Sequence, residues 1–484
     1  MAQSIKLNYF YNTLLNISKV VFPLITAPYV SRVLEPDGIG LFNFSNSFAE
    51  YFALFAALGV PLYGVREIAK MKDNLKKQNE FVSEIMSITV ISTILFSILS
   101  FCTIVFLPRL KENLIIFLVA SFTLYITPFR IDWFFSGKED FGYITARSLI
   151  VKFFSIILLF VLVRDKSDLL IYVSLNAACQ VVNEMWNFCK LYKLGIHPHF
   201  TLKVKRHIKP LLYLLSSSIA VSIYLILDTL MLGVMKNLSE VGYYNSATHV
   251  SRAILPIVTS FSIVALPKIS KYKEVSNWKE INRIANMSLS LILYISIPVV
   301  MGVVAIAPQF VPLFFGSLFY EAILPLQIVI TTIIAIGINN LLGIQILVGF
   351  GFDKLFLISV IMGALSNFIL NLVMIPKFGA AGAAFSSVFA EFLIVFIMLH
   401  LIYRFTPVRF NRFKEFTFNV CICSSFFVIT HFVSFVAERW VYILLSIICC
   451  SSFYVLMQWL IKNPSEILII KNVEKKIKEY KRNF

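Results

Sequence analysis

The stretch at residues 284–306 reads IANMSLSLILYISIPVVMGVVAI and contains no charged side chain. A helix needs about 20 mostly apolar residues to cross the hydrocarbon core of a bilayer, and this stretch is slightly longer. Basic residues precede it, between Lys268 and Arg283. The stretch therefore predicts a membrane-spanning helix that begins on the side of the membrane where positive charge collects.

The rest of the chain repeats this pattern. Of its 484 residues, 58% are apolar and only 14% are charged, whereas soluble domains carry about 25% charged residues. This composition excludes an ordinary soluble enzyme and a disordered chain. We predict an all-α polytopic membrane protein with about 14 transmembrane helices, at residues 8–31, 39–62, 81–107, 114–134, 146–163, 168–189, 210–234, 243–267, 284–306, 322–350, 355–375, 380–402, 416–436 and 440–461.

The net charge of +17 comes from 43 Lys and Arg against 26 Asp and Glu. In a soluble protein this excess would indicate nucleic-acid binding, but the cytoplasmic loops of membrane proteins also collect Lys and Arg. If both termini lie in the cytoplasm, the segments on that side carry 31 of these basic residues and the outer segments carry eight. The asymmetry predicts that both termini are cytoplasmic, and we expect no nucleic-acid partner.

A short internal repeat predicts two halves. GLFN at residues 40–43 opens the second predicted helix, and GYYN at residues 242–245 opens the eighth, 202 residues later. Duplicated halves are common in secondary transporters. We therefore predict an N-terminal six-helix lobe at 1–205, a C-terminal six-helix lobe at 206–405, two additional transmembrane helices at 406–462 and a basic cytoplasmic tail at 463–484.

Polar side chains recur at helical spacing inside three predicted helices, where residues three or four apart share a face. Because a charge inside the membrane costs about 2.5–3.5 kcal/mol, such groups face partners or a water-filled cavity. Two interpretations stay open for the amides: a polar cavity between the lobes, or hydrogen bonds that join helices. For Lys19 and Arg252 we favour the cavity, with a salt bridge to Glu50 or Asp228 as the main alternative. The three groups are Asn12, Asn16 and Lys19; Asn43, Asn46 and Glu50; and Asn245, His249 and Arg252.

Other charged residues and missing motifs narrow the function. Arg130, Asp132 and Lys152 fall near predicted helix ends, where we expect their side chains to reach toward the cytoplasmic interface. The sequence contains no phosphate-binding P-loop, no zinc-protease motif and no serine-hydrolase motif. The longest outer loop, at 307–321, is too short to form a catalytic domain. We therefore expect no enzymatic activity, no cofactor and no metal.

Five segments carry a family resemblance. The most distinctive is DWFFSGKEDF at residues 132–141, and the others are SRVLEPDGIG at 31–40, GVREIAK at 64–70, VGYYNSA at 241–247 and FGAAGAA at 378–384. Together they resemble the oligosaccharide (Wzx-type, O-antigen) flippases. These form the polysaccharide-transport branch of the multidrug/oligosaccharidyl-lipid/polysaccharide (MOP) exporter superfamily. The resemblance covers the first 12 helices and leaves the last two without a signature.

The resemblance implies two MATE-like lobes, arranged in a V, that open alternately to the two sides of the bacterial inner membrane. It implies a flippase for oligosaccharide repeat units on undecaprenyl pyrophosphate, of O-antigen or capsule type, moved from the cytoplasmic to the periplasmic leaflet for polysaccharide or lipopolysaccharide biosynthesis. Members of the family use cationic cavity residues for the pyrophosphate, and depth and helix face make Lys19 and Arg252 our candidates. Glu50 and Asp228 are candidates for coupling to H+ or Na+. Membrane lipids and the glycan polymerase machinery are the other expected partners.

Two other functions stay open. A cation-coupled multidrug exporter of the same superfamily would have an acidic or aromatic cavity in place of a cationic one. A membrane glycan polymerase or ligase would be an enzyme acting on the same glycans. The short outer loops and the repeat argue against this enzyme.

Overall fold

The computed structural model describes residues 5–71, 74–259 and 266–461, and within these ranges the chain is helical and contains no strand. Packing divides the chain into two compact units, Met1–Asn245 and Ser246–Phe484. The sequence predicts a boundary between lobes after residue 205. Packing places its boundary after Asn245, which assigns helix α10 (Lys205–Met235) and the start of α11 (Leu238–Thr259) to the first unit. The predicted division into lobes stays a prediction.

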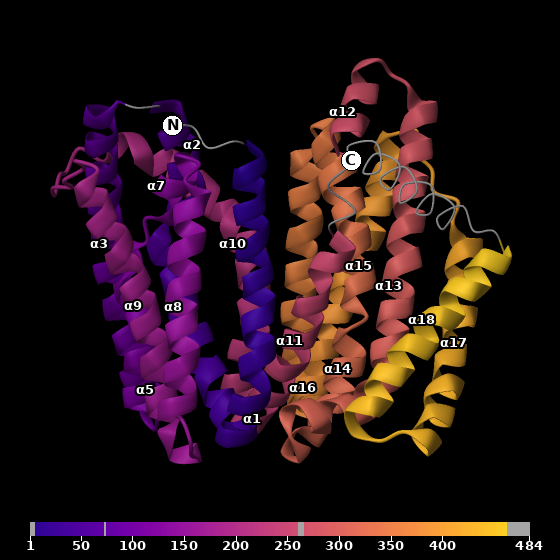
Figure 1. The fold of residues 1–484 in the computed structure, drawn as a ribbon. Helices are drawn as coiled ribbons and strands as arrows, with labels where there is room; N and C mark the ends of the chain where they lie inside the picture. Colours follow the sequence, from indigo (N-terminus) through magenta and orange to yellow (C-terminus); the bar gives the residue numbers. More distant parts are fainter. Residues whose placement is uncertain (1–4, 72–73, 260–265, 462–484) are drawn as a thin grey trace, which may run out of the picture. The chain divides into compact units, whose positions relative to one another are not determined.

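In the first unit, the long helix α1 packs against α3, α8 and α10, and α8 lies beside α9 (Figure 1). Asn74 caps α3 and Asp140 caps α8, because each side chain accepts a hydrogen bond from a backbone N–H of the first turn. The helices are α1 (Ile5–Ala57), α2 (Val60–Met71), α3 (Leu75–Phe106), α4 (Pro108–Lys111), α5 (Leu114–Ala120), α6 (Phe122–Tyr125), η1 (Thr127–Phe129), α7 (Asp132–Gly137), α8 (Phe141–Leu162), η2 (Lys166–Asp168), α9 (Leu169–Lys193), α10 (Lys205–Met235) and α11 (Leu238–Thr259), which continues into the second unit.

In the second unit, α13 packs against α17 and α18, which lie side by side (Figure 1). The predicted helix at 322–350 is divided into short α, π and 3-10 segments. The helices are α12 (Leu266–Glu274), α13 (Trp278–Phe315), η3 (Ser317–Ala322), α14 (Ile323–Val329), α15 (Thr332–Asn339), the π-helix η4 (Asn340–Leu347), η5 (Val348–Phe350), α16 (Asp353–Phe405), α17 (Phe413–Val436) and α18 (Arg439–Ile461).

Two helices each contain two predicted spans. Helix α1 is interrupted at Glu35 (φ 58°, ψ 176°), between the spans predicted at 8–31 and 39–62. Helix α16 is interrupted at Gly379 (φ 55°, ψ −129°), between those predicted at 355–375 and 380–402. At the first break, Lys166 Nζ donates a hydrogen bond to Glu35 Oε2 over 2.6 Å, and this bond raises the pKa of Lys166 above its ordinary value.

The described residues contain eight helices that are long and apolar enough to cross a membrane, together with shorter apolar helices at Leu114–Phe129 and Ile226–Met235. Every predicted span has a helical counterpart. Part of the span predicted at 243–267 falls on residues 260–265, and the predicted tail at 463–484 falls on residues 462–484, both outside the described residues. The predicted fold class, an all-α polytopic membrane protein, is confirmed.

The segment between α9 and α10 is attached along α3. The backbone N–H groups of His197, His199 and Thr201 donate to Asn79, Ser83 and Ser87 over 2.7, 3.2 and 3.0 Å. Four helical residues rise about 6 Å, which two extended residues also span. Donors two residues apart on the segment therefore reach acceptors four residues apart on α3, so the segment runs extended along the helix.

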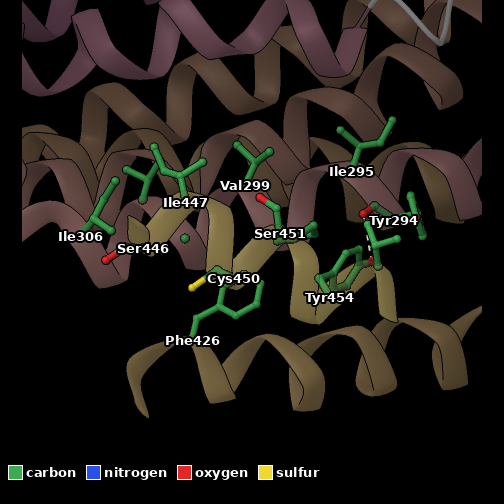
Figure 2. Close-up of a pocket in the computed structure, with 14 residues that line it drawn as sticks. Tyr294, Ile295, Val299, Ile306, Phe426, Ser446, Ile447, Cys450, Ser451 and Tyr454 are labelled. Atoms are coloured by element: carbon green, nitrogen blue, oxygen red, sulfur yellow. Dashed lines mark hydrogen bonds between the residues drawn. The ribbon is translucent and has the colours of Figure 1, made fainter. Parts of the chain in front are cut away.

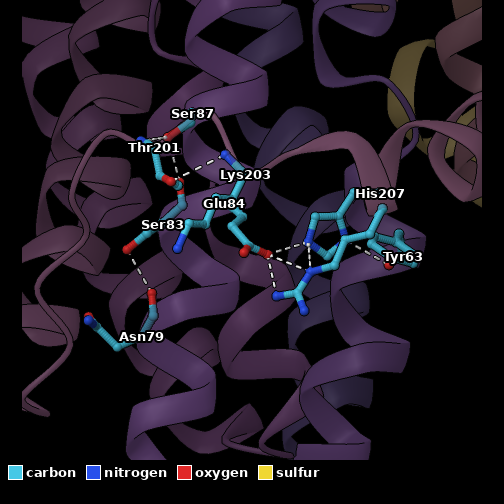
Figure 3. A network of polar contacts seen from close by, with 9 residues as sticks. Tyr63, Asn79, Ser83, Glu84, Ser87, Thr201, Lys203 and His207 are labelled. Atoms are coloured by element: carbon cyan, nitrogen blue, oxygen red, sulfur yellow. Dashed lines mark hydrogen bonds and ion pairs between the residues drawn. The ribbon is translucent and has the colours of Figure 1, made fainter.

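A buried ionic network ends this attachment at the start of α10 (Figure 3). Glu84 Oε2 accepts hydrogen bonds from Arg206 Nε over 2.9 Å and Nη2 over 2.5 Å. The same oxygen lies 2.6 Å from His207 Nε2, while His207 Nδ1 lies 2.8 Å from the Tyr63 hydroxyl. Tyr63, Glu84 and His207 are all buried. The network joins α2, α3 and α10, which places the beginning of α10 in the first unit.

Candidate functional site

A ladder of polar side chains follows the first half of α1. Lys19 Nζ donates to Asn16 Oδ1 over 3.4 Å, and Asn16 Nδ2 donates to Asn12 Oδ1 over 3.4 Å. All three side chains are exposed, although the predicted span around them is apolar. Lys19 lies midway along that span. The predicted stripe therefore exists as a chain of hydrogen bonds that leads to a cation.

Lys152 on α8 is a second cation beside this ladder, and the interpretation that placed it at a helix end is wrong. Helix α8 begins at Phe141, earlier than the predicted start at 146, so Lys152 lies midway along the helix. Its Nζ donates to Ser18 Oγ over 3.3 Å and lies 5.3 Å from the centre of the Phe22 ring. The side chain therefore points at α1. The sequence could have indicated this, because Lys152 lies within an apolar run and has no acidic residue four positions before or after it.

Neither Lys19 nor Lys152 takes part in an ion pair within the described ranges. Other cations of the same unit do have acidic partners. Arg147, for example, donates to Asp132 Oδ1 over 2.9 Å, and its side chain is only 2% exposed. The two lysines thus differ from Arg147, whose charge is paired between α7 and α8.

The second half of α1 carries Asn43, Asn46 and Glu50. Asn43 Nδ2 donates to the Ile39 carbonyl of its own helix over 2.8 Å, which satisfies its amide locally. Asn43 and Asn46 are half-buried, and Glu50 is exposed. This bond lies within α1 and joins no second helix, so both interpretations of Asn43 stay predictions. Glu50 has the exposure that an ion-coupling residue needs.

Asp228 and Asn245 each take part in a hydrogen bond between α10 and α11. The Tyr244 hydroxyl donates to Asp228 Oδ2 over 2.6 Å, and the Thr229 hydroxyl donates to Asn245 Oδ1 over 3.3 Å. Both Asp228 and Asn245 are buried. Asn245 therefore joins helices, whereas His249 and Arg252, one and two turns further along α11, are exposed. The predicted stripe on this helix is divided between a buried and an exposed part.

The repeat-related glycines lie at a close helix crossing. A Cβ atom on Gly40 would lie 1.8 Å from the Leu238 carbonyl oxygen, and one on Gly242 would lie 2.2 Å from the Pro36 carbonyl oxygen. The Ser239 hydroxyl donates a hydrogen bond to Asp37 in the same crossing. Residues 36 and 238, 37 and 239, and 40 and 242 are each separated by 202 positions. The crossing is thus reciprocal, as a local two-fold relation between the repeats requires.

Lys19, Glu50 and Asp228 belong to the first compact unit, and His249 and Arg252 belong to the second. A cavity shared by Lys19 and Arg252, and a pairing of Arg252 with Glu50, both stay predictions.

A groove of about 370 Å³ lies within the second unit, among α13, α17 and α18 (Figure 2). Its lining is mostly aliphatic and aromatic, with Tyr294, Phe426 and Tyr454 among the larger side chains. No charged side chain lines it. Its polar side chains are hydroxyl-bearing, at Ser446, Ser451 and the two tyrosines, so the groove offers no charge to pair with a phosphate.

Comparisons with known proteins agree with this architecture. The sequence matches the profile of the family described as "Polysaccharide biosynthesis protein" over residues 5–273. The "Putative O-antigen transporter" of Escherichia coli (strain K12) is 26% identical over 413 residues, which cover 82% of this chain and 96% of that protein.

Two solved structures have a similar fold. The lipid II flippase MurJ, in an inward closed conformation, has a TM-score of 0.65 at 17% identity, covering 91% of this chain and 99% of that one. An inward-facing multidrug resistance MATE family transporter of the MOP superfamily has a TM-score of 0.59 at 15% identity, covering 80% and 94%. At these identities the likeness is one of fold, and it confirms the predicted MATE-like class.

Proposed function

Because this chain belongs to the polysaccharide biosynthesis protein family, we propose that it is a flippase for lipid-linked oligosaccharides. The cargo is an oligosaccharide repeat unit, of O-antigen or capsule type, on undecaprenyl pyrophosphate. It moves from the cytoplasmic to the periplasmic leaflet of the bacterial inner membrane. The name of the Escherichia coli relative, an O-antigen transporter, supports this cargo.

The observation that carries the proposal is the polar ladder on α1. Exposed amides at Asn12 and Asn16 lead to Lys19 midway along a span that is otherwise apolar. A glycan offers many hydroxyl groups to amides, and a pyrophosphate offers charge to an ammonium group. A cation-coupled multidrug exporter is expected to have an acidic or aromatic cavity, and a lysine at this depth does not fit that expectation. Arg252, exposed on α11, is the second cation of the proposed site.

The proposed mechanism is alternating access between two six-helix lobes, 1–205 and 206–405, with both termini in the cytoplasm. The crossing of Gly40 and Gly242 follows the outer loops of the predicted topology, so it would close the periplasmic side and separate when the cargo leaves. Moving negative charge outward runs with a negative-inside potential, which is worth about 2.3 kcal/mol per charge per 100 mV.

Coupling to H+ or Na+ would add to this driving force. Asp228, buried beside the Tyr244 hydroxyl, is one candidate, and the exposed Glu50 is the other. Contact with the glycan polymerase that consumes the cargo, and the absence of catalysis by this chain, are part of the same proposal.

The test is a flipping assay with purified protein in proteoliposomes. A labelled undecaprenyl-pyrophosphate oligosaccharide in one leaflet should become accessible to an impermeant reagent in the other, and Lys19→Met should abolish this movement. Movement of cationic drugs without movement of the glycan lipid would favour the multidrug exporter. Elongation of the glycan would favour the polymerase.

A further inference from the structure

Lys19 and Lys152 are held at one level of the membrane by the packing of α1 on α8. Lys152 Nζ contacts Ser18, the residue before Lys19, over 3.3 Å. Two hydrogen bonds fix the register on either side. Thr145 Oγ1 donates to the Tyr11 carbonyl over 3.0 Å, and the Tyr29 hydroxyl donates to the Val163 carbonyl over 2.7 Å. The two lysines therefore cannot slide apart without breaking these contacts.

This packing places two like charges near each other, and among the residues that the structure describes no ion pair offsets either charge. Because Lys152 Nζ bonds to Ser18, the chain neighbour of Lys19, the two ammonium groups belong to adjoining positions of the α1–α8 contact, and charges repel more strongly where water is partly excluded. Lys152 is half-buried against the Phe22 ring, while Lys19 is exposed. Two ammonium groups held in this way repel each other, and an anion bound between them relieves the repulsion.

The number of ammonium groups indicates the kind of anion that the site would bind. A lysine ammonium is a compact point charge with three donors, and one such group suffices to pair a single phosphate. Two ammonium groups on neighbouring helices suit two linked phosphates better than one. Asn16, which accepts from Lys19, orients that ammonium group.

We propose that Lys19 and Lys152 together bind a diphosphate and select lipid carriers with a diphosphate linkage over those with a monophosphate. The inference rests on the proposed flippase function and deepens it. It assigns Lys152 to substrate binding, and it places the determinant of carrier class between α1 and α8 within the first unit.

The experiment measures binding to the full chain in lipid nanodiscs. The probes are a short-chain prenyl diphosphate and the prenyl monophosphate of the same chain length, with inorganic pyrophosphate as competitor. The wild type should bind the diphosphate at least about tenfold more tightly. Since a hydrogen bond to a charged group contributes about 1.5–3 kcal/mol, Lys152→Met should weaken diphosphate binding about tenfold to a hundredfold, and it should leave the monophosphate nearly unchanged.

Two controls separate binding from folding. Lys377→Met removes one charge from an exposed position on α16 and should leave both affinities unchanged. Lys152→Arg keeps the charge and should keep most of the preference for diphosphate, whereas a purely structural bond to Ser18 would make the affinities insensitive to charge. Competition by inorganic pyrophosphate in the wild type, reduced in Lys152→Met, would show that the site recognises the anion and not the prenyl chain.

The failures are distinguishable. An undiminished diphosphate preference in Lys152→Met, or an equal loss in Lys377→Met, overturns the diphosphate site while the flippase proposal stands. A wild-type protein that binds neither prenyl phosphate overturns both.

Discussion

Gly40 and Gly242, 202 residues apart in the chain, lie where two helix backbones touch. A Cβ on Gly40 would approach the Leu238 carbonyl oxygen to 1.8 Å, and one on Gly242 would approach the Pro36 carbonyl oxygen to 2.2 Å. Real Cβ atoms do not come so close to backbone atoms. Gly40 thus leaves space for the backbone just before Gly242, and Gly242 leaves space for the backbone just before Gly40. A side-chain rotation cannot relieve either contact, because the neighbouring atoms are backbone atoms.

Gly242→Ala should therefore weaken the crossing. An extra methyl group in a tightly packed contact costs about 1–3 kcal/mol, which exceeds the gain of about 1 kcal/mol that alanine brings to a helix. We expect a lower midpoint of thermal unfolding for the purified protein. If the crossing closes the periplasmic side, cysteines introduced nearby on α11 should also become more reactive to an impermeant periplasmic reagent.

The matched control is Gly302→Ala on α13, where an added Cβ would meet nothing within 4 Å. This change should leave thermal stability unchanged or slightly raised. Equal effects of the two substitutions would contradict the role assigned to the crossing.

Glu84→Ala should destabilise the first unit. The Glu84 carboxylate accepts from Arg206 and lies beside the buried His207 ring, so its loss leaves the buried Nε2 of His207 without this partner. Unsatisfied buried groups cost about 1–3 kcal/mol. The measurement is thermal or denaturant unfolding in detergent, together with limited proteolysis between α9 and α10, which should become faster.

Glu280→Ala provides the comparison, because Glu280 pairs with Arg283 on an exposed helix face over 2.8 Å. Exposed pairs of this kind contribute little to stability, because water screens both charges. If the Glu84 variant is no less stable than the Glu280 variant, the network does not anchor α10.

Arg252→Ala should stop glycan export without lowering the amount of folded protein. Arg252 is exposed on α11, and in the proposed site it pairs with the pyrophosphate. Arg252→Lys should retain part of the activity, because it keeps the charge and loses the bidentate geometry. The measurement is surface polysaccharide in a strain that depends on this protein, normalised to protein level.

Arg164→Ala, at an exposed position outside the predicted spans, serves as the control for charge and should export normally. Normal surface glycan in a stably expressed Arg252→Ala strain would remove Arg252 from the site.

The predicted topology has its own test. A reporter fused after Lys236 should be periplasmic, and one fused at Phe484 should be cytoplasmic, since 31 basic residues lie on one side of the predicted arrangement and eight on the other. The reverse result at either position would contradict the orientation of the 14-helix arrangement.

Much of the architecture could be predicted from the residues alone. Apolar length determines where helices cross a bilayer, because unsatisfied backbone groups cannot enter lipid. The span at 284–306 and its flanking basic residues are readable without a structure for this reason. The spacing of Asn12, Asn16 and Lys19 likewise places them on one face, and the structure joins them by hydrogen bonds. The repeat that includes Gly40 and Gly242 could also be recognised from the sequence, as similar segments separated by 202 positions.

Contacts between helices were not readable in this way, because they depend on register and on small shifts of helix ends. Helix α8 begins at Phe141 and not at the predicted residue 146, so Lys152 lies in the middle of the helix, beside Ser18. The separation of Asn245, which is buried next to Thr229, from the exposed Arg252 depends on how α10 packs on α11. Sequence spacing specifies the face of one helix. Which neighbour covers that face, and therefore which polar group is structural and which is available to a ligand, was decided only by the tertiary packing.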